Sequence, residues 1–360
     1  METNIKKPKS SKDIKKAQKN IIIACCSILG VIVLGFATYG GYKMATDFGK
    51  VEKPKAAVAE PVTTREVTTT EAIKQFWWET NSFEQLSTDP ALNGKDDLHN
   101  GTLILVNSDW AYCGDSSEVA SIYENRGTGE NKAPYSVKDR DVSLRLPVIN
   151  SLNDMFKGFY AATNISDVFV ESGYRTKEYQ EALYVNGDPN YIQMPGFSEH
   201  ESGYAVDFAI MKGEVRHDFE EEGDYAWIHE NAHNYGFILR YPADKIGFTG
   251  IAHESWHFRY VGVPHATYMY ENNLCLEEYI TLLHDYKYDK EHLYVKTTGN
   301  IYEIYYVPSD PTAMITQVPV YDDSTYEVSG NNTDGYIITI ERGSDFTIPT
   351  YTEETVTVNG

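Results

Sequence analysis

The chain has 360 residues, a formal net charge of −22 and four Cys residues. A hydrophobic share of 41% is ordinary for a globular protein and excludes a chain that is disordered throughout. The 53 acidic against 31 basic residues argue against nucleic acid as a partner, because phosphate binding needs clustered Lys and Arg. The length fits two ordinary domains, or one domain of about 200 residues with appendages.

The N-terminal region carries a membrane signal. Residues 1–20 hold seven Lys against Glu2 and Asp13, and residues 21–42 contain no charged side chain. An apolar run of this length can cross the hydrocarbon core of a bilayer, which needs about 20 residues. Basic residues before the run place the N-terminus in the cytoplasm. We therefore expect a basic cytoplasmic tail (1–20), a single transmembrane helix in the lipid bilayer (21–42), and an extracellular location for the rest.

A cleaved signal peptide and a lipoprotein are the alternatives to this anchor. A signal peptide has a shorter apolar core, and residues 37–41 offer only a weak small-residue cleavage site. The segment that ends at Cys25 resembles a lipoprotein box, but the long apolar stretch follows Cys25 instead of preceding it. An uncleaved anchor in the cell membrane is the favoured interpretation.

The rest of the chain divides into three parts that differ in composition and in hydrophobic pattern. Residues 43–80, which include a run rich in Thr, Pro and Ala, show no sustained period and are typical of a linker. Residues 81–290 mix helix and strand patterns without regular alternation, which favours an α+β domain with a small antiparallel sheet flanked by helices. Residues 291–360 hold short strand patterns separated by turn signals. We expect them to form a small β-rich appendage packed on the main domain.

The main domain (81–290) and the appendage (291–360) contain several predicted helices and strands. A helix is expected to open at Pro147, because apolar residues recur on one face after it. A second helix is expected to run to Val185, with the Thr176 side chain as its cap. Strands are expected in the main domain at 102–106, 167–171, 204–210 and 256–261, and in the appendage at 293–295, 301–307, 318–321 and 336–340.

Two distant stretches supply a set of metal ligands. His200 and Asp207 lie seven residues apart, and His257 follows with Glu254 three residues before it. Two imidazoles and one carboxylate leave the fourth position of a tetrahedral Zn²⁺ ion open for water. Glu254 is then placed to act as a base. Residues three apart on a straight strand face opposite sides, so this arrangement requires a turn or bulge near Ser255.

These residues carry a resemblance to a known family. The pattern Ser-x-His-x-x-Gly-x-Ala-x-Asp followed by Glu-x-x-His resembles the signature of VanY-type D-alanyl-D-alanine carboxypeptidases, which are zinc peptidases of bacterial cell walls. The resemblance covers roughly residues 98–285. It implies one Zn²⁺ ion on His200, Asp207 and His257, with Glu254 as catalytic base, and it places Arg175, Gln180 and Ser198 where the family holds the terminal carboxylate of the substrate. The fixed positions of the signature are present as Ser198, His200, Gly203, Ala205, Asp207, Glu254 and His257.

The expected function is the removal of the C-terminal D-alanine from peptidoglycan stem peptides outside the membrane. A guanidinium matches a carboxylate in a bidentate way, so Arg175 suits recognition of a free C-terminus. The alternatives are an L,D-carboxypeptidase or an endopeptidase of the same fold, and a non-catalytic cell-wall-binding protein. Cys113 and Cys275 either pair in a disulfide or remain free thiols.

A second metal motif competes with this one. Residues 229–233 read His-Glu-x-x-His, in which both histidines of a zincin bind Zn²⁺. At about 100° per residue, however, His229 and His233 fall opposite the apolar face of the expected helix. We therefore interpret them as solvent-exposed histidines at chance spacing.

Overall fold

The computed structural model describes residues 70–74, 82–88, 96–116, 118–188, 190–321, 325–349 and 353–357, and residues 70–357 belong to one compact unit. The predicted tail at 1–20 and the predicted transmembrane helix at 21–42 lie outside the described residues, as does most of the predicted linker. None of the described helices is long and apolar enough to cross a membrane.

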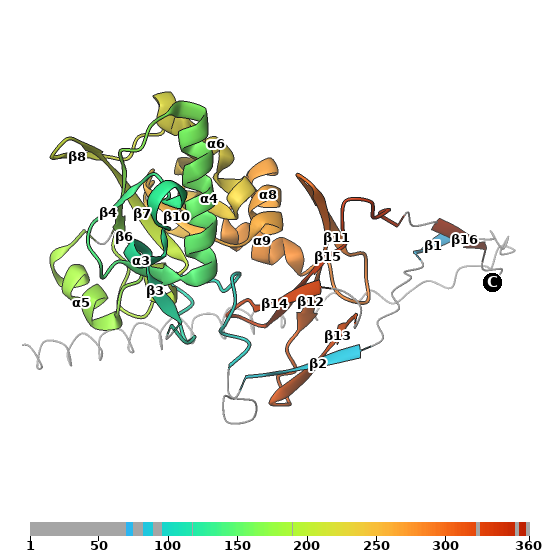
Figure 1. Ribbon diagram of the computed structural model, residues 1–360. Coiled ribbons are helices and arrows are strands. Elements are labelled where there is room, and N and C mark those ends of the chain that lie inside the picture. The colour runs from blue at the N-terminus through green and yellow to red at the C-terminus, as the bar shows by residue number, and fades with distance from the viewer. Residues whose placement is uncertain are drawn as a thin grey trace, which may run out of the picture. The chain divides into compact units, whose positions relative to one another are not determined.

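A six-stranded sheet forms the centre of the main domain (Figure 1). Its strands pair antiparallel, apart from β4 and β6, which run parallel. The mixed helix-and-strand fold is as predicted. The strand order is β4 (Ser136–Val137), β6 (Val168–Ser172), β7 (Ala205–Lys212), β10 (His257–Tyr260) and β9 (Phe237–Leu239), with β8 (Val215–Asp218) paired to β7.

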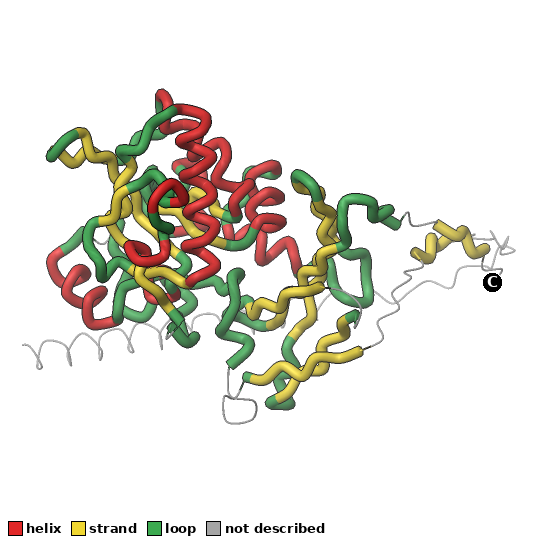
Figure 2. Tube along the Cα trace, viewed as in Figure 1, coloured by secondary structure: helices red, strands yellow, loops and turns green. Residues whose placement is uncertain are grey.

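The helices and short strands of the main domain surround this sheet (Figure 2). The α-helices are α3 (Ile122–Asn125), α4 (Leu146–Thr163), α5 (Lys177–Asn186), α6 (Ala226–Asn231), α7 (Ile246–Thr249), α8 (Val263–Glu271) and α9 (Leu276–Leu283). The 3-10 helices are η1 (Gly129–Asn131), η2 (Glu199–Ser202), η3 (Gly223–Tyr225), η4 (Ala232–Tyr235) and η5 (Ala243–Lys245). β3 (Val119–Ser121) pairs with β5 (Ser143–Arg145).

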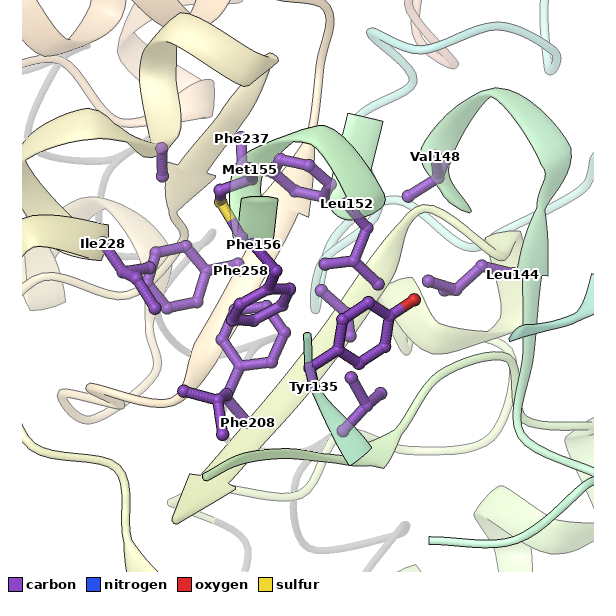
Figure 3. Close-up of a cluster of buried hydrophobic side chains, with 14 of the residues drawn as sticks. Tyr135, Leu144, Val148, Leu152, Met155, Phe156, Phe208, Ile228, Phe237 and Phe258 are labelled. Atoms are coloured by element: carbon purple, nitrogen blue, oxygen red, sulfur yellow. The ribbon is translucent and has the colours of Figure 1, made fainter. Parts of the chain in front are cut away.

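The helix α4 covers one face of the sheet. Pro147 occupies its first turn, as predicted, and its buried side follows the one-face spacing of the sequence. Figure 3 shows the ring of Phe156 from this helix beside the rings of Phe208 and Phe258 from the sheet. The ring centroids of Phe156 and Phe208 are 5.3 Å apart, and those of Phe208 and Phe258 are 5.1 Å apart. These aromatic contacts fix the position of the two central strands.

The strand β7 is buried on both faces, and the side chains on one face are larger than those on the other. Val206, Phe208 and Ile210 belong to the hydrophobic core beneath α4. Residues on a strand alternate between faces, so the other face carries Asp207 between two alanines. Small neighbours on that face leave room around the Asp207 carboxylate.

The helix α5 follows β6 in the chain, and it begins after the predicted cap residue Thr176. The Thr176 hydroxyl oxygen accepts a hydrogen bond from the backbone N–H of Tyr179 at 3.2 Å, which satisfies one of the free amides at the helix N-terminus. The segment between β6 and this cap contains Arg175. The cap therefore fixes the point at which the chain turns away from the end of β6.

The predicted strand at 102–106 is wrong. The segment is buried, but it has no strand structure. Its carbonyl oxygens are satisfied by side chains instead of a neighbouring strand: Arg259 donates to the Thr102 and Ile104 carbonyls at 2.9 Å each, and Asn332 donates to the Leu105 carbonyl at 2.8 Å. A buried backbone needs partners, and here long polar side chains supply them.

The C-terminal strands form three small sheets. One has the order β11 (Leu293–Thr297), β12 (Asn300–Pro308), β15 (Gly335–Glu341) and β14 (Thr325–Gly330). A second sheet pairs β13 (Ile315–Val320) with β2 (Ser82–Ser87), a segment at the start of the predicted main domain. β1 (Thr70–Lys74) pairs with β16 (Glu353–Thr357). The strands β1, β2, β14 and β16 were not predicted.

These C-terminal strands share a hydrophobic core with the main domain. Leu276, Tyr279 and Leu283 of α9 belong to the same buried cluster as Ile304 of β12 and Ile337 of β15. The expected packing of the appendage on the main domain is therefore present.

Cys113 and Cys275 are both free thiols. Cys113 is exposed, whereas Cys275 is buried at the start of α9. Burial raises the pKa of the Cys275 thiol to about 12, so this group stays protonated at neutral pH.

His265 joins α8 to its neighbours and is buried in its neutral form. Its Nδ1 lies 2.8 Å from the Tyr279 hydroxyl, and its Nε2 lies 3.0 Å from the Thr339 hydroxyl. Burial lowers the pKa of His265 to about 3. The unfolded chain therefore binds a proton at this residue as the pH falls below 6.5, while the folded chain does not. Stability is lost in that range.

We predict that this linkage is measurable in the pH dependence of unfolding. Between pH 7 and pH 5, the free energy of unfolding of the wild type should fall by about 2 kcal/mol more than that of His265→Gln. Urea unfolding of both proteins at the two pH values measures this difference. Equal losses in the two proteins would contradict the assignment.

Candidate active site

Asp207 and His257 lie directly opposite each other on neighbouring strands. The register of β7 and β10 pairs these two residues, so their side chains project from the same face of the sheet. The Asp207 Oδ1 atom lies 2.9 Å from His257 Nδ1, and both residues are buried. Two residues that are 50 positions apart in the sequence thus meet because the strands pair in this register.

His200 reaches the same place from η2. Its Nε2 lies 3.2 Å from Asp207 Oδ2, and its Nδ1 lies 2.6 Å from the Gly173 carbonyl oxygen. Gly203 ends η2 with φ +75°, and a Cβ there would lie 2.9 Å from Val119 Cγ1. Both the backbone angle and the close contact require glycine at this turn. The turn brings the chain from His200 into β7.

The three side chains fit a divalent metal ion. One ligand atom from each of His200, Asp207 and His257 lies within 4.8 Å of the others, and no other such group occurs among the residues that the structure describes. Two imidazole nitrogens and a carboxylate oxygen are a ligand set that Zn²⁺ accepts with one position left open. The Gly173 carbonyl accepts the Nδ1–H of His200, which leaves the lone pair on Nε2 facing Asp207.

The charges around the two imidazoles act in opposite directions. Burial lowers the pKa of His200 to about 4, and Arg175 adds to this effect. Burial also opposes a charge on His257, but Asp207 and Glu199 outweigh it and raise the pKa of His257 to about 9. The carboxylates therefore attract positive charge to the point at which the ligand atoms converge.

Glu254 lies beside the ligands because the chain turns before β10. Ser255 and Trp256 form a turn in which the backbone N–H of His257 meets the Glu254 carbonyl at 3.4 Å. The turn that the sequence requires near Ser255 is present. Glu254 Oε2 lies 3.7 Å from His257 Nδ1. Burial raises the pKa of Glu254 to about 7, against the opposing effect of His257, and a carboxyl group with this pKa can exchange a proton near neutral pH.

Arg175 is held at the edge of the ligand group. Its Nη2 donates to Asp207 Oδ2 at 2.6 Å, and its Nε donates to the Ser172 hydroxyl at 2.9 Å. Its Nη1 has a long contact of 3.5 Å with Gln180 Oε1. The loosely engaged Nη1 is therefore the part of the guanidinium that is best placed to bind a further anion.

All seven site residues predicted from the sequence meet at one cavity of about 300 Å³. Tyr241, Ile251 and Trp256 form part of its less polar wall. The combination of a few convergent polar groups with apolar walls is typical of a small-molecule or peptide-end site. The predicted residues that line the cavity are Arg175, Gln180, Ser198, His200, Asp207, Glu254 and His257.

Comparison with known proteins matches this arrangement to a family. The family model of VanY, D-alanyl-D-alanine carboxypeptidase, matches residues 141–263. A D-alanyl-D-alanine carboxypeptidase of Enterococcus faecium is 34% identical over 259 residues, which cover 70% of this chain and 79% of the relative. The chain belongs to the VanY family.

Two further relatives widen the comparison. A bifunctional D-Ala-D-Ala dipeptidase and D-Ala-D-Ala carboxypeptidase of Enterococcus gallinarum, VanXYC, is 36% identical over 167 residues, covering 43% of this chain and 83% of the relative. The crystal structure of the vancomycin resistance D,D-dipeptidase VanXYg, in complex with a D-Ala-D-Ala phosphinate analogue, is similar with a TM-score of 0.61 and 30% identity. That match covers 72% of this chain and 99% of the solved chain. The fold described above is thus the fold of known VanY-family relatives.

The two histidines of the His-Glu-x-x-His segment of this VanY-family chain are partly buried, contrary to the prediction. The helix α6 gives way to η4 after Asn231, so residues 229 and 233 are not on one regular helical face. The His229 ring packs on Phe258 with centroids 5.2 Å apart, and the His233 ring stacks on Tyr270 at 4.0 Å. Neither histidine belongs to the metal-ligand group found among the described residues.

Glu199 is a residue of the site that was not predicted from the sequence. This residue lies between Ser198 and His200, and its buried Oε2 lies 3.6 Å from His257 Nε2. The sequence contains one signal for this residue: a charged side chain stands directly before the ligand His200, in a segment that must be buried. It gives no indication of the contact with His257, which is 58 residues away.

We predict that the His200 group and not the His229 group binds a divalent ion. Titration of the full-length protein with Zn²⁺ should show binding that His200→Ala weakens by at least about 10²-fold, because one of three protein ligands is lost. The double variant His229→Gln with His233→Gln should keep the wild-type affinity. The opposite pattern would support the zincin motif.

Proposed function

We propose that the protein is a membrane-anchored, zinc-dependent D-alanyl-D-alanine carboxypeptidase that removes the C-terminal D-alanine from peptidoglycan stem peptides. The observation that carries this proposal is the shared cavity, in which a metal-ligand group, a carboxyl group with a pKa near 7 and a guanidinium meet. Membership of the VanY family supports the reaction, and the name of the E. faecium relative supports the substrate.

The chain's own residues supply the proton transfer. When bound by His200, Asp207 and His257, Zn²⁺ supplies a Lewis acid that acidifies water and polarises a carbonyl group. Glu254 accepts the proton of the attacking water at a carboxylate oxygen and passes it to the departing amine. Its burial serves both steps, because a carboxyl group with a pKa near 7 is a stronger base than an exposed one and still releases its proton.

Arg175 restricts cleavage to the chain end. Its Nη1 binds the terminal carboxylate of the substrate, while Nη2 and Nε hold the guanidinium against Asp207 and Ser172. Because Asp207 is also a metal ligand, the carboxylate site and the metal site share one side chain. The scissile bond is thereby held at a fixed distance from the guanidinium of Arg175 and from the metal site.

The membrane anchor is supported by the sequence alone. The uncharged residues 21–42 and the Lys-rich residues 1–20 before them favour a single-pass protein with a cytoplasmic N-terminus. In this arrangement the catalytic domain works outside the cell membrane, where peptidoglycan lies.

Replacement of Glu254 by Gln tests the assignment of the base. The variant should release D-alanine from a stem pentapeptide about 10³-fold more slowly in kcat, because proton transfer is lost while the side-chain volume is kept. Its Zn²⁺ affinity should stay close to that of the wild type, because Glu254 is not in the ligand group. Unchanged kcat in Glu254→Gln would rule out this role.

Amidation of the substrate tests the role of Arg175. The wild type should prefer a pentapeptide with a free C-terminus over its C-terminal amide by about 10²-fold in kcat/KM, because the charged hydrogen bonds are lost in the amide. In Arg175→Ala the preference should shrink to a small factor. The ratio is measured within each protein, so a general loss of activity in the variant cancels. A preference that survives the substitution would place the carboxylate site elsewhere.

A dipeptidase activity is the second candidate, favoured by the similarity to VanXYg and VanXYC. Purified protein incubated with pentapeptide, tetrapeptide and free D-Ala-D-Ala, followed by mass analysis of the products, separates the possibilities. Release of D-alanine from the pentapeptide alone supports the main proposal. Cleavage of the free dipeptide adds the second activity, and cleavage of the tetrapeptide indicates an L,D-carboxypeptidase.

A further inference from the structure

Two buried polar atoms face each other behind the metal-ligand group. Glu199 Oε2 and His257 Nε2 are 3.6 Å apart, and both side chains are at most 5% exposed. Neither atom has a hydrogen-bond partner among the residues that the structure describes. Because a buried polar atom without a partner is costly, their mutual approach suggests that they act on each other.

The other oxygen of Glu199 is firmly held. Glu199 Oε1 accepts hydrogen bonds from Arg240 Nε at 2.8 Å and from Arg259 Nη1 at 2.7 Å. Both guanidinium groups are fully buried. The carboxylate therefore cannot rotate away from His257, and its second oxygen stays directed toward the imidazole.

Each arginine is anchored in turn. Arg240 makes two hydrogen bonds to Glu277, at 2.9 Å and 2.6 Å, and Arg259 binds the Thr102 and Ile104 carbonyls. Two guanidinium groups and two carboxylates give this four-residue network no net charge. The two guanidinium groups that donate to Glu199 Oε1 favour the charged form of this carboxylate. Glu199 is thus a fixed buried anion.

The two nitrogens of His257 have different surroundings. Nδ1 faces Asp207 Oδ1 at 2.9 Å and Glu254 Oε2 at 3.7 Å, whereas Nε2 faces Glu199. A metal ion at the ligand group needs the lone pair of Nδ1, so the imidazole proton must reside on Nε2. A carboxylate oxygen only accepts hydrogen bonds, and it therefore favours this tautomer.

We propose that Glu199 is a positioning residue that fixes the ring orientation and the tautomer of His257, so that Nδ1 is presented to the metal ion. His200 uses the opposite arrangement, since its Nδ1 is held by the Gly173 carbonyl and its Nε2 faces the ligand group. The two histidines of the site are thus oriented through different nitrogens by different acceptors. This inference rests on the metal site of the proposed function and adds a residue to it.

The test compares Glu199→Gln with Glu277→Gln in the full-length protein. Both variants remove one carboxylate charge from the same network, but only Glu199 faces His257. Zinc affinity, measured by competition with a chelator, should fall about 10- to 100-fold in Glu199→Gln and stay within about threefold of the wild type in Glu277→Gln. Equal losses in the two variants would reduce Glu199 to a structural member of the network and overturn the proposal.

A second measurement is made on the wild type, and a variant serves only to assign the signals. Selective ¹⁵N labelling of histidine in the zinc-loaded protein, with His257→Gln for assignment, distinguishes the metal-bound nitrogen from the protonated one. We expect Nδ1 of His257 to be metal-bound and Nε2 to carry the proton. A metal-bound Nε2 overturns the proposal, whereas a wild type that binds no zinc contradicts the proposed function itself.

Discussion

The pairing register of β7 with β10 is the constraint on which the site depends. Side chains alternate between the faces of a strand, so a slip by one residue would move His257 to the face opposite Asp207. The register is held from the other side of the sheet, where Phe258 pairs with Val206 and packs with Phe208 under α4. The hydrophobic core thereby sets the geometry of the polar site, although the two share no atoms.

The network of Glu199, Arg240, Arg259 and Glu277 lies between this sheet and α9. Burying four charged groups is costly even when they are paired, and the net contribution of such a network to stability is small. Removing a single member, however, leaves an unpaired charge in the interior. The network is better understood as a device that fixes geometry, since it connects η2, the loop at 102–106 and α9 through directional hydrogen bonds.

Local rules account for most of what the sequence predicted correctly. The helix after Pro147, the Thr176 cap and the alternation in β7 depend on neighbours within a few residues, and the turn at Ser255 follows from the requirement that Glu254 and His257 face one point. The failures depend on distant partners. The loop at 102–106 is satisfied by the side chains of Arg259 and Asn332, and His229 is covered by the ring of Phe258. No spacing in the sequence records these contacts.

The strand β2 gives the C-terminal sheets an unusual dependence on the start of the domain. The hydroxyl of Ser87, at the end of β2, donates a hydrogen bond to the carbonyl of Met314, which lies 227 residues later. The strands β2 and β13 pair along their whole length. Closing so long a loop costs more conformational entropy than closing a short one. A chain ended near residue 290 would leave β2 unpaired and uncover Leu276, Tyr279 and Leu283 of α9. A strand from the β-rich region therefore completes the pairing of a strand at the start of the domain, and the two parts of the chain are joined by this pairing as well as by their common hydrophobic core.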